Sequence, residues 1–347
     1  MCQTDQELWT DPRCTLLGIE KFGPFIKLGN GDILTVEENA TLISSDKGVT
    51  WSESRPICDQ PGTGAPSNSG VMLRTREGVV VFVYMDIENL RWSWDESRRE
   101  ASEDVSLNVW TIRSEDEGLT WTGRQQIFDG YCGALINMIQ TSTGEIVVPI
   151  QRLVRHPCRH AICVYVSADN GATWQHSNII DLGGHGHHDG AMEPTVVELS
   201  DGRLWMLIRT NLGRFWSAFS SDHGLSWRVI RPSDIDASSA PAAMIRLASG
   251  RLALVWNRFY PEGMTSYPTR GGDGNLSAVP TSWHRDEASL AFSADDGATW
   301  SEPVVILRIK GGGPSYPHLF EPAPGQLWVT TQFRDKVAMR LRESDFV

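Results

Sequence analysis

The sequence contains no apolar run long enough to span a membrane, so we expect neither a transmembrane helix nor a membrane partner. Basic residues are also scarce, because 31 Lys and Arg stand against 43 Asp and Glu, a formal net charge of −12. Proteins that bind nucleic acid or anionic lipid need a basic surface, so we expect no nucleic-acid partner. The acidic total does not exclude an anionic small molecule, because a few arginines can make one pocket positive.

Cysteine is sparse as well, with six in 347 residues and no CxxC pair of the kind that holds structural zinc. Residues 1–7 lack both the basic and the apolar segment of a signal peptide. We therefore expect a cytoplasmic location with reduced, partly buried cysteines. We assign no cofactor and no metal ligand.

Turn residues and tryptophan are abundant, with 32 Gly, 18 Pro and 14 Trp. Five segments share the pattern S-x-D-x-G-x-S/T-W, at 44–51, 114–121, 167–174, 220–227 and 293–300. In such a turn the Asp accepts backbone N–H groups, the Gly adopts a positive φ, and the Trp carries apolar surface into the layer beneath. We interpret these Asp residues as folding devices and not as catalysts.

A second unit, in which two apolar strands flank a Gly-containing turn, occurs six times. Its turns lie near residues 29–32, 76–78, 142–144, 200–203, 248–250 and 324–325. Six units of about four strands predict an all-β fold, a six-bladed β-propeller with five Asp-box turns. We expect one domain over residues 1–347, with the segment 14–19 completing the last blade.

These repeats resemble the sialidase-like superfamily, the Asp-box (BNR-repeat) six-bladed propellers, over nearly the whole chain. The resemblance implies a site on the propeller face opposite the Asp boxes. In that family three arginines bind a substrate carboxylate, a Tyr assisted by a Glu is the nucleophile, and an Asp on a loop is the acid/base. Function depends on the site and not on the scaffold, so each position is compared separately.

Four positions match the family pattern. Glu193 starts the fourth inner strand, and Arg209 ends the strand paired with it. Tyr316 opens the sixth inner strand, and Arg285 precedes the strand that leads into the last Asp box. The resemblance implies that Tyr316 and Glu193 are catalytic and that the two arginines bind substrate.

Two parts of the pattern are missing. Phe22, Gly23 and Pro24 stand where sialidases have Arg-Ile-Pro, so the first arginine is absent. The acid/base loop is absent too, because residues 36–40 simply join two strands. We therefore expect an acidic sugar other than sialic acid as the substrate.

Other strand ends point at the same face. Asp86 is a further catalytic candidate, and Glu37, Arg152 and Arg258 are substrate-binding candidates. The alternative is that these charges are only solvated strand ends. The insertion behind Asp86, which carries Trp92 and Trp94, is interpreted either as a rim of the site or as a charged loop. The long loop 261–284 has the same two interpretations.

The most unusual segment is Gly184–Gly190, which contains three histidines directly before Glu193. A histidine exchanges protons near neutral pH, so His188 and Asp189 are catalytic candidates. A metal site and a solvated loop remain open as alternatives.

The leading hypothesis is an exo-acting glycoside hydrolase of an anionic sugar, with a small-molecule or oligosaccharide substrate. Tyr316 would attack the sugar, Glu193 would accept its proton, and Asp86 or Asp189 would protonate the leaving group. A neutral Tyr suits attack beside a carboxylate, which would repel an anionic nucleophile.

Two alternatives stay open. One is a uronate lyase that acts on polysaccharide or oligosaccharide through His188, Arg209 and Tyr316. The other is a non-catalytic propeller that binds glycan or protein.

Overall fold

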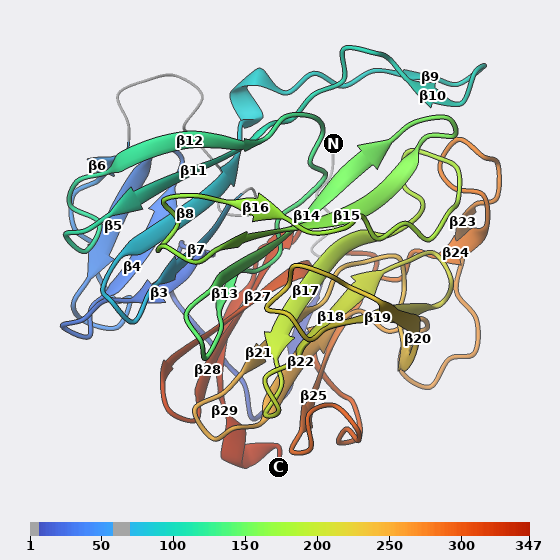
Figure 1. Cartoon of the computed structure of the whole chain (residues 1–347). Helices are drawn as coiled ribbons and strands as arrows, with labels where there is room; N and C mark the ends of the chain where they lie inside the picture. Colours follow the sequence, from blue (N-terminus) through green and yellow to red (C-terminus); the bar gives the residue numbers. More distant parts are fainter. Residues whose placement is uncertain (1–6, 58–69) are drawn as a thin grey trace.

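Short apolar strands separated by turns form six antiparallel sheets, which are the blades of a β-propeller (Figure 1). The computed structural model describes residues 7–57 and 70–347. The predicted all-β class and the six-bladed architecture are therefore confirmed. The inner strands of neighbouring blades contact each other around the axis, as β27 contacts β3 and β17 contacts β21.

The first three blades are built from consecutive strands, named here from the axis outward. Blade 1 contains β3 (Phe25–Lys27), β4 (Ile33–Glu37), β5 (Ala40–Ser44) and β6 (Arg55–Pro56). Blade 2 contains β7 (Gly70–Arg74), β8 (Val80–Met85), β11 (Val109–Ser114) and β12 (Thr122–Phe128). Blade 3 contains β13 (Ile139–Gln140), β14 (Ile146–Val154), β15 (Arg159–Ser167) and β16 (Gln175–His176).

The last three blades follow the same order. Blade 4 contains β17 (Met192–Glu198), β18 (Leu204–Arg209), β19 (Arg214–Ser220) and β20 (Val229–Asp236). Blade 5 contains β21 (Ala243–Arg246), β22 (Leu252–Trp256), β25 (Glu287–Ser293), β26 (Val304–Ile309) and, at its outer edge, β1 (Leu8–Thr10). Blade 6 contains β27 (Ser315–Ala323), β28 (Gln326–Phe333), β29 (Ala338–Arg342) and β2 (Thr15–Leu16).

Two insertions carry the remaining elements. The insertion of blade 2 contains η2 (Ile87–Asn89), β9 (Trp94–Asp95) and β10 (Glu100–Ala101), and it projects beyond the blades in Figure 1. The loop of blade 5 contains β23 (Thr269–Gly271) and β24 (Pro280–Ser282), and η3 (Glu343–Asp345) follows β29. No helix among the described residues has the length and apolar character needed to cross a membrane.

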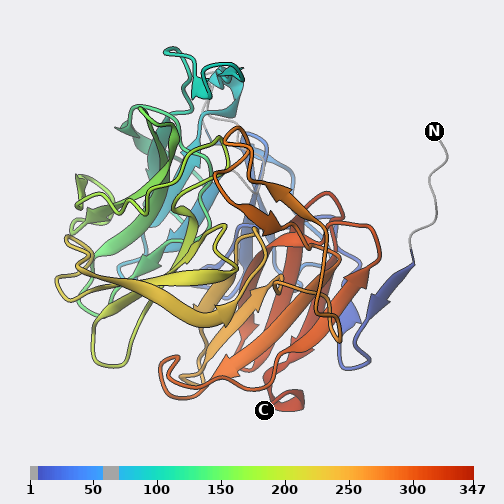
Figure 2. The ribbon, with the colours of Figure 1, turned by 90° about the vertical axis from the view of Figure 1, so that its right-hand side faces the viewer.

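The N-terminal segment closes the ring. Strand β2 pairs with β29, as predicted for residues 14–19, so both ends of the chain contribute to blade 6. Strand β1 adds a fifth strand to blade 5, on the flank seen in Figure 2, and this pairing was not predicted. At the inner edge, the Phe25 N–H donates to His318 Nε2 at 3.3 Å and joins blade 1 to blade 6.

Apolar side chains fill the spaces between neighbouring blades. Among the described residues, six hydrophobic clusters each join one blade to the next, as Phe25 and Ile33 of blade 1 pack with Phe320 and Trp328 of blade 6. Four cysteines are buried and free, as expected, and they are Cys14, Cys132, Cys158 and Cys163. Cys2 and Cys58 lie outside the described residues.

All five Asp boxes have the same hydrogen bonds. In the third box, Asp169 accepts the Thr173 N–H at 2.8 Å, the Thr173 hydroxyl at 2.6 Å and the Ser167 hydroxyl at 2.8 Å. The Ser167 hydroxyl also accepts the Gly171 N–H at 2.8 Å. The Asp therefore closes the turn that joins the third strand to the fourth, as the sequence predicts.

The boxes share one face with the turns of the inner hairpins. The Ser200 N–H, in the inner turn of blade 4, donates to Asp296 of the last box at 3.0 Å. The Gly29 N–H, in the inner turn of blade 1, donates to Glu117 of the second box at 3.3 Å. Inner strands consequently begin at the opposite face, where Glu193 and Tyr316 are expected.

We predict that Asp169→Ala lowers the free energy of unfolding by about 1–3 kcal/mol, because it removes the acceptor of three hydrogen bonds. Urea denaturation measures the loss. Asp104→Ala is the matched control, because Asp104 is exposed outside any box. Equal stability of the two variants would contradict the structural role of the box.

We also predict that the fold loses stability as the pH falls below about 6.5. Burial lowers the pKa of His318 to about 4, so the unfolded chain binds a proton there before the folded chain does. Between pH 6.5 and 4 this histidine lowers the free energy of unfolding by up to about 1.4 kcal/mol for each unit of falling pH. His318→Gln should flatten the dependence of the melting temperature on pH, whereas the exposed His176→Gln should not. An unchanged slope in His318→Gln would show that His318 plays no part.

Candidate functional site

Glu193 and Tyr316 meet across the axis, at the face opposite the Asp boxes. The Tyr316 hydroxyl donates to Glu193 Oε1 at 2.5 Å, although the two residues belong to blades 4 and 6. The Arg209 Nη1 group donates to the other carboxylate oxygen, Oε2. Three of the residues selected from the sequence therefore form one hydrogen-bonded cluster.

The backbone is unusual at both residues. Glu193 has φ 39° and Tyr316 has φ 55°, which lie in the left-handed region that L-residues seldom adopt. An irregular register between Met192 and Thr195 accompanies the first of them. Backbone strain of this kind persists only where the surrounding structure holds the residue in place, and it is concentrated at functional sites. Here it aims both side chains toward the axis.

Arg209 is held on all sides by the protein. Its side chain is 1% exposed, and its Nε and Nη2 groups donate to the Ser239 hydroxyl at 3.2 and 2.8 Å. Burial lowers the pKa of Arg209, but the charges and hydrogen bonds of Glu193 and Tyr316 together outweigh burial, and the pKa is raised. Arg209 thus positions the Glu193 carboxylate, and direct contact between Arg209 and a substrate remains a prediction.

Arg285 has no carboxylate partner within residues 7–57 and 70–347. Its Nη2 group donates to the Ser239 carbonyl at 2.9 Å and its Nη1 group to the Ser315 hydroxyl at 3.4 Å. Its Nε group is buried and has no hydrogen-bond partner among the described residues. Burial, together with the positive charge of Arg209, lowers the pKa of Arg285 to about 10, so the group stays charged at neutral pH.

Among the described residues, the cluster therefore carries one uncompensated positive charge, because the Glu193 carboxylate pairs with Arg209 and interacts with Arg285 only through its charge. A buried charge without a counter-ion is costly. Such a charge marks a place that an anionic ligand can complete.

Tyr316 keeps its proton in this environment. Burial, with the Glu193 charge adding to it, raises the pKa of Tyr316 to about 12. Its ring lies 5.3 Å from the Phe333 ring, and the Arg285 guanidinium lies 4.7 Å from Phe333. The hydroxyl is thus a neutral group whose proton already points at a carboxylate.

His188 also lies at this cluster. Its ring is 5.8 Å from Trp283, and both Arg209 and Arg285 lie over the same indole, at 5.8 and 5.4 Å. Its Nδ1 atom is 2.6 Å from Nδ1 of His187. In the described part of the chain no three His, Cys, Asp or Glu side chains form a group that could hold a metal ion.

Asp189 anchors the histidine loop instead of facing the cluster. Its carboxylate accepts the N–H groups of His185 at 3.0 Å, Gly190 at 2.8 Å and Ala278 at 2.8 Å. Both oxygens are therefore used to fix the loop against blade 5. Its predicted role as the acid has no support from these contacts and stays a prediction.

No contact between described residues joins the other four candidates to the Glu193 cluster. Asp86 accepts both of its side-chain bonds from Asn89, and Glu37 is paired with Lys21 at 2.5 Å. Arg258 lies 3.6 Å from Asp236. These residues end second strands at the predicted face but bind neighbours within or beside their own blades, and their part in the site remains untested.

Arg152 is the fourth of these candidates, and its neighbour explains its position. The Gln151 side chain accepts the Glu193 N–H at 2.9 Å. Successive side chains of a strand point to opposite sides, so Arg152 points away and lies 5.5 Å from the Phe128 ring. The side chain of β14 that contacts Glu193 is therefore Gln151, and substrate binding by Arg152 stays a prediction.

The insertions form a rim at this face. The Trp94 Nε1–H donates to Asn275 Oδ1 at 3.1 Å, and the His187 N–H donates to the Asn275 carbonyl at 2.9 Å. Trp92 is 40% exposed and lies 4.7 Å from the Tyr131 ring. In Figure 2 the insertion of blade 2 (cyan) and the loop of blade 5 (orange) both lie at the top. The contacts favour the rim over the charged-loop interpretation.

Phe22 occupies the place of the missing arginine. Its carbonyl accepts the Thr330 hydroxyl and the Gln332 amide, both at 2.7 Å, and its ring lies 5.6 Å from Lys336 Nζ. Gly23 is required beside it, because a Cβ there would approach His318 Cδ2 to 2.6 Å. The Phe22 ring and the Lys336 ammonium group therefore lie together on this side of blade 1.

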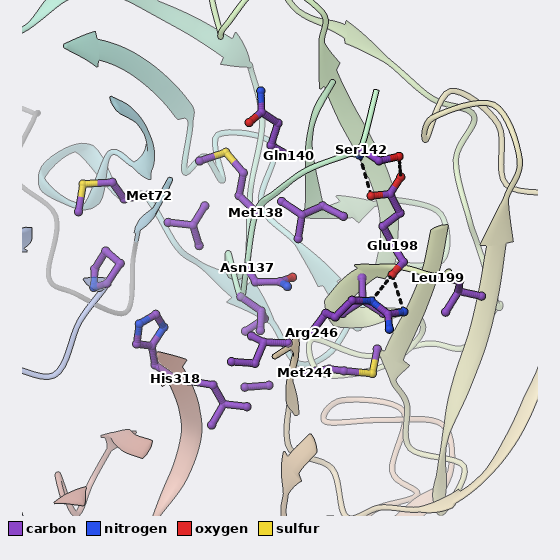
Figure 3. Close-up of a pocket in the computed structure, with 18 of the residues that line it drawn as sticks. Met72, Asn137, Met138, Gln140, Ser142, Glu198, Leu199, Met244, Arg246 and His318 are labelled. Atoms are coloured by element: carbon purple, nitrogen blue, oxygen red, sulfur yellow. Dashed lines mark hydrogen bonds between the residues drawn. The ribbon is translucent and has the colours of Figure 1, made fainter. Parts of the chain in front are cut away.

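A large cavity lies elsewhere among the described residues. It has a volume of about 790 Å³, and inner-strand residues such as Met72, Met244 and His318 line it (Figure 3). The charged groups in the wall of this cavity are bound to other protein groups. The Glu198 carboxylate accepts the Ser142 N–H at 2.7 Å, and the Glu198 carbonyl accepts the Arg246 Nη2 group at 2.8 Å. Glu193 and Tyr316 do not line this cavity, so the candidate site rests on the charged cluster and not on cavity size.

The sequence did not single out several residues that complete the cluster, namely Gln151, Asn211, Ser239, Trp283 and His187. Ser239 precedes the inner strand of blade 5, at a place similar to that of Glu193 in blade 4. That topological position was the only signal that could have found it.

We predict strong coupling between Glu193 and Arg209. Arg209→Met leaves a buried carboxylate unpaired and should destabilise the fold by about 3–5 kcal/mol, measured by urea denaturation. Adding Glu193→Gln should cost less than the sum of the two single changes. Arg203→Met is the control, because the Arg203–Asp201 pair is about half exposed and contributes about 1 kcal/mol or less. Additive effects at Glu193 and Arg209 would contradict the buried pair.

Comparison with known proteins agrees with this architecture. Residues 35–329 match the model of the BNR repeat-like domain, and no curated protein matches the sequence. Among solved structures, a protein of unknown function from Dyadobacter fermentans is 16% identical, with a TM-score of 0.65 over 96% of this chain and 99% of its own.

Sialidases are similar at the level of the fold. The K499G mutant of the NanB sialidase from Streptococcus pneumoniae is 13% identical, with a TM-score of 0.63 over 96% of this chain and 70% of its own. A leech intramolecular trans-sialidase is 14% identical, with a TM-score of 0.60 over 97% and 71%. The chain belongs to the BNR repeat-like family, with the six-bladed sialidase-like fold.

Proposed function

We propose that this protein is an exo-acting glycoside hydrolase of an acidic sugar. The observation that carries the proposal is the 2.5 Å hydrogen bond from Tyr316 to Glu193, beside the unmatched guanidinium of Arg285. This arrangement combines a neutral nucleophile, a base in contact with it and a cation for the substrate. The Asp-box fold and the similarity to sialidases support the same reaction class.

Tyr316 attacks the anomeric carbon as Glu193 takes the hydroxyl proton. The bond from the anomeric carbon to the leaving oxygen breaks, its electron pair goes to that oxygen, and a proton from solvent completes the leaving hydroxyl group. Water then displaces Tyr316 from the sugar and loses one proton to solvent, and Glu193 returns its proton to the phenol oxygen. The high pKa of Tyr316 makes proton transfer to Glu193 necessary for attack, and the existing hydrogen bond prepares it.

Arg285 binds the carboxylate of the substrate. Its buried Nε group lacks a partner, and a carboxylate would satisfy both this donor and the extra positive charge. With Phe22 in place of the first arginine, the carboxylate has fewer cations around it than in sialidases. A hexuronic acid or another acidic sugar therefore suits the site better than sialic acid does.

A uronate lyase is the second candidate, because one observation favours it. Burial, with the nearby arginines adding to it, lowers the pKa of His188 to about 2, so this ring is a neutral potential base beside two cations. A lyase would produce an unsaturated uronate, which absorbs ultraviolet light, and a hydrolase would not. Absorbance during turnover of uronate oligosaccharides distinguishes the two reactions.

Tyr316→Phe should lower the turnover of acidic aryl glycosides on the order of 10³-fold or more, because it removes the attacking oxygen. Release of the aryl alcohol from a panel of glucuronides, galacturonides and sialosides measures the effect.

Tyr260→Phe is the matched control and should keep the wild-type rate, because the Tyr260 ring packs on Phe259 and makes no ring contact or hydrogen bond with Glu193, Arg209, Arg285 or Tyr316 in the described part of the chain. Full turnover in Tyr316→Phe would defeat the assignment. Wild-type protein that binds these sugars but leaves them intact would favour a non-catalytic propeller.

A further inference from the structure

Ser239 binds both buried guanidinium groups of the cluster, and it does so through two different groups. Its hydroxyl accepts the Nε and Nη2 groups of Arg209 at 3.2 and 2.8 Å. Its carbonyl accepts the Nη2 group of Arg285 at 2.9 Å. We propose that Ser239 is a positioning residue, whose hydroxyl holds Arg209 on Glu193 and whose carbonyl holds Arg285 for the substrate carboxylate. This inference rests on the proposed hydrolase function.

The direction of the Ser239 hydroxyl is fixed by Asn211. The hydroxyl donates its one proton to Asn211 Oδ1 at 2.7 Å, so the lone pairs of the oxygen are left for Arg209. The Asn211 amide in turn donates to the His188 carbonyl at 2.5 Å. Ser239, Asn211 and Arg209 are 0%, 3% and 1% exposed, so solvent does not compete for these hydrogen bonds.

The Ser239 hydroxyl determines which side of the Arg209 guanidinium group faces Glu193. The group is planar, and its Nε and Nη2 groups form one edge. Both groups donate to the same oxygen of Ser239, which fixes the plane and the rotation of the guanidinium group. The Nη1 group then donates to Glu193 Oε2, while Glu193 Oε1 accepts the Tyr316 hydroxyl at 2.5 Å. The position of the base beside Tyr316 therefore depends on Ser239 through Arg209.

The two contacts of Ser239 can be separated by mutation, because only one of them uses the side chain. The backbone of this residue is held from blade 5, since the Ser239 N–H donates to the carbonyl of Ser282, the last residue of β24, at 2.9 Å. Truncation of the side chain removes the acceptor of Arg209 and leaves the backbone carbonyl that accepts Arg285. The first contact serves the chemical step, and the second serves substrate binding.

Steady-state kinetics of Ser239→Ala test this division, with the acidic aryl glycoside that the wild-type protein hydrolyses fastest. We expect kcat to fall by about 10- to 100-fold, because a displaced Glu193 accepts the Tyr316 proton less well. KM and the inhibition constant of the free sugar acid should change by less than about twofold, because the contact to Arg285 remains.

Ser238→Ala is the matched control. Ser238 is the preceding residue and is 0% exposed like Ser239, but its hydroxyl has no hydrogen-bond partner among the described residues. This variant should keep the wild-type kcat and KM. An equal loss of kcat in both variants would contradict the proposal, because any truncation at this place would then have the same effect.

Hydrogen exchange of the arginine side chains provides a measurement that does not depend on turnover. The whole protein is labelled with 15N-arginine, and the Nε–H signals are assigned from Arg209→Lys and Arg285→Lys. Ser239→Ala should speed exchange of the Arg209 Nε–H by about tenfold or more, because its acceptor is removed. The Arg285 Nε–H should exchange at the wild-type rate.

The outcomes separate the inference from the proposed function. A folded Ser239→Ala variant with the wild-type kcat overturns the role of Ser239 and leaves the proposed hydrolase standing. Unchanged exchange of the Arg209 Nε–H overturns the role too. If the wild-type protein hydrolyses no acidic glycoside, the proposed function fails, and the exchange measurement still tests whether Ser239 holds Arg209. Where Ser239→Ala does not fold, rapid exchange of the Arg209 Nε–H in the wild-type protein overturns the proposal.

Discussion

The buried Glu193 carboxylate and the two guanidinium groups around it govern the rest of the site. Arg209 compensates the charge of the buried Glu193 carboxylate, and its own charge is neutralised in that ion pair. Among the described residues, Arg285 then remains as a second buried cation without a carboxylate partner. This imbalance favours an anion as the ligand, whereas the low pKa of His188 comes first from burial and only then from the nearby arginines. The site is therefore positive because it contains two guanidinium groups and one carboxylate.

The propeller makes this cluster possible because it brings separate blades together at one axis. Glu193 and Tyr316 are 123 positions apart, yet both stand at the start of an inner strand and meet directly. The Asp boxes close the opposite ends of the blades, and apolar clusters hold each blade to the next. A rigid ring of this kind can keep two residues in left-handed backbone conformations. The propeller therefore positions Glu193 and Tyr316, and the chemical properties of the site come from their side chains.

The sequence predicts those features that repeat or that follow from strand topology. The boxes, the six blades and the common face of Glu193, Arg209, Arg285 and Tyr316 belong to this class. The distance of a residue from the propeller axis cannot be predicted in this way. The end of a strand indicates the face on which a residue lies, but not how far from the axis it lies. Glu37 and Asp86 illustrate this, since each binds a neighbour in its own region. Asp189 could not be distinguished from His188, because its partner Ala278 comes from a loop 89 positions later.

The most direct test of the account is to trap the covalent intermediate and locate it by peptide mass spectrometry. Suitable reagents are both anomers of 2-deoxy-2-fluoro-D-glucuronosyl fluoride, the corresponding galacturonosyl fluorides and 2,3-difluoro-N-acetylneuraminic acid. The account predicts that a reagent which inactivates the protein labels the peptide containing Tyr316, and that Tyr316→Phe prevents the label. A label on a carboxylate residue would contradict the account, as would hydrolysis of an acidic glycoside that proceeds with no label at Tyr316.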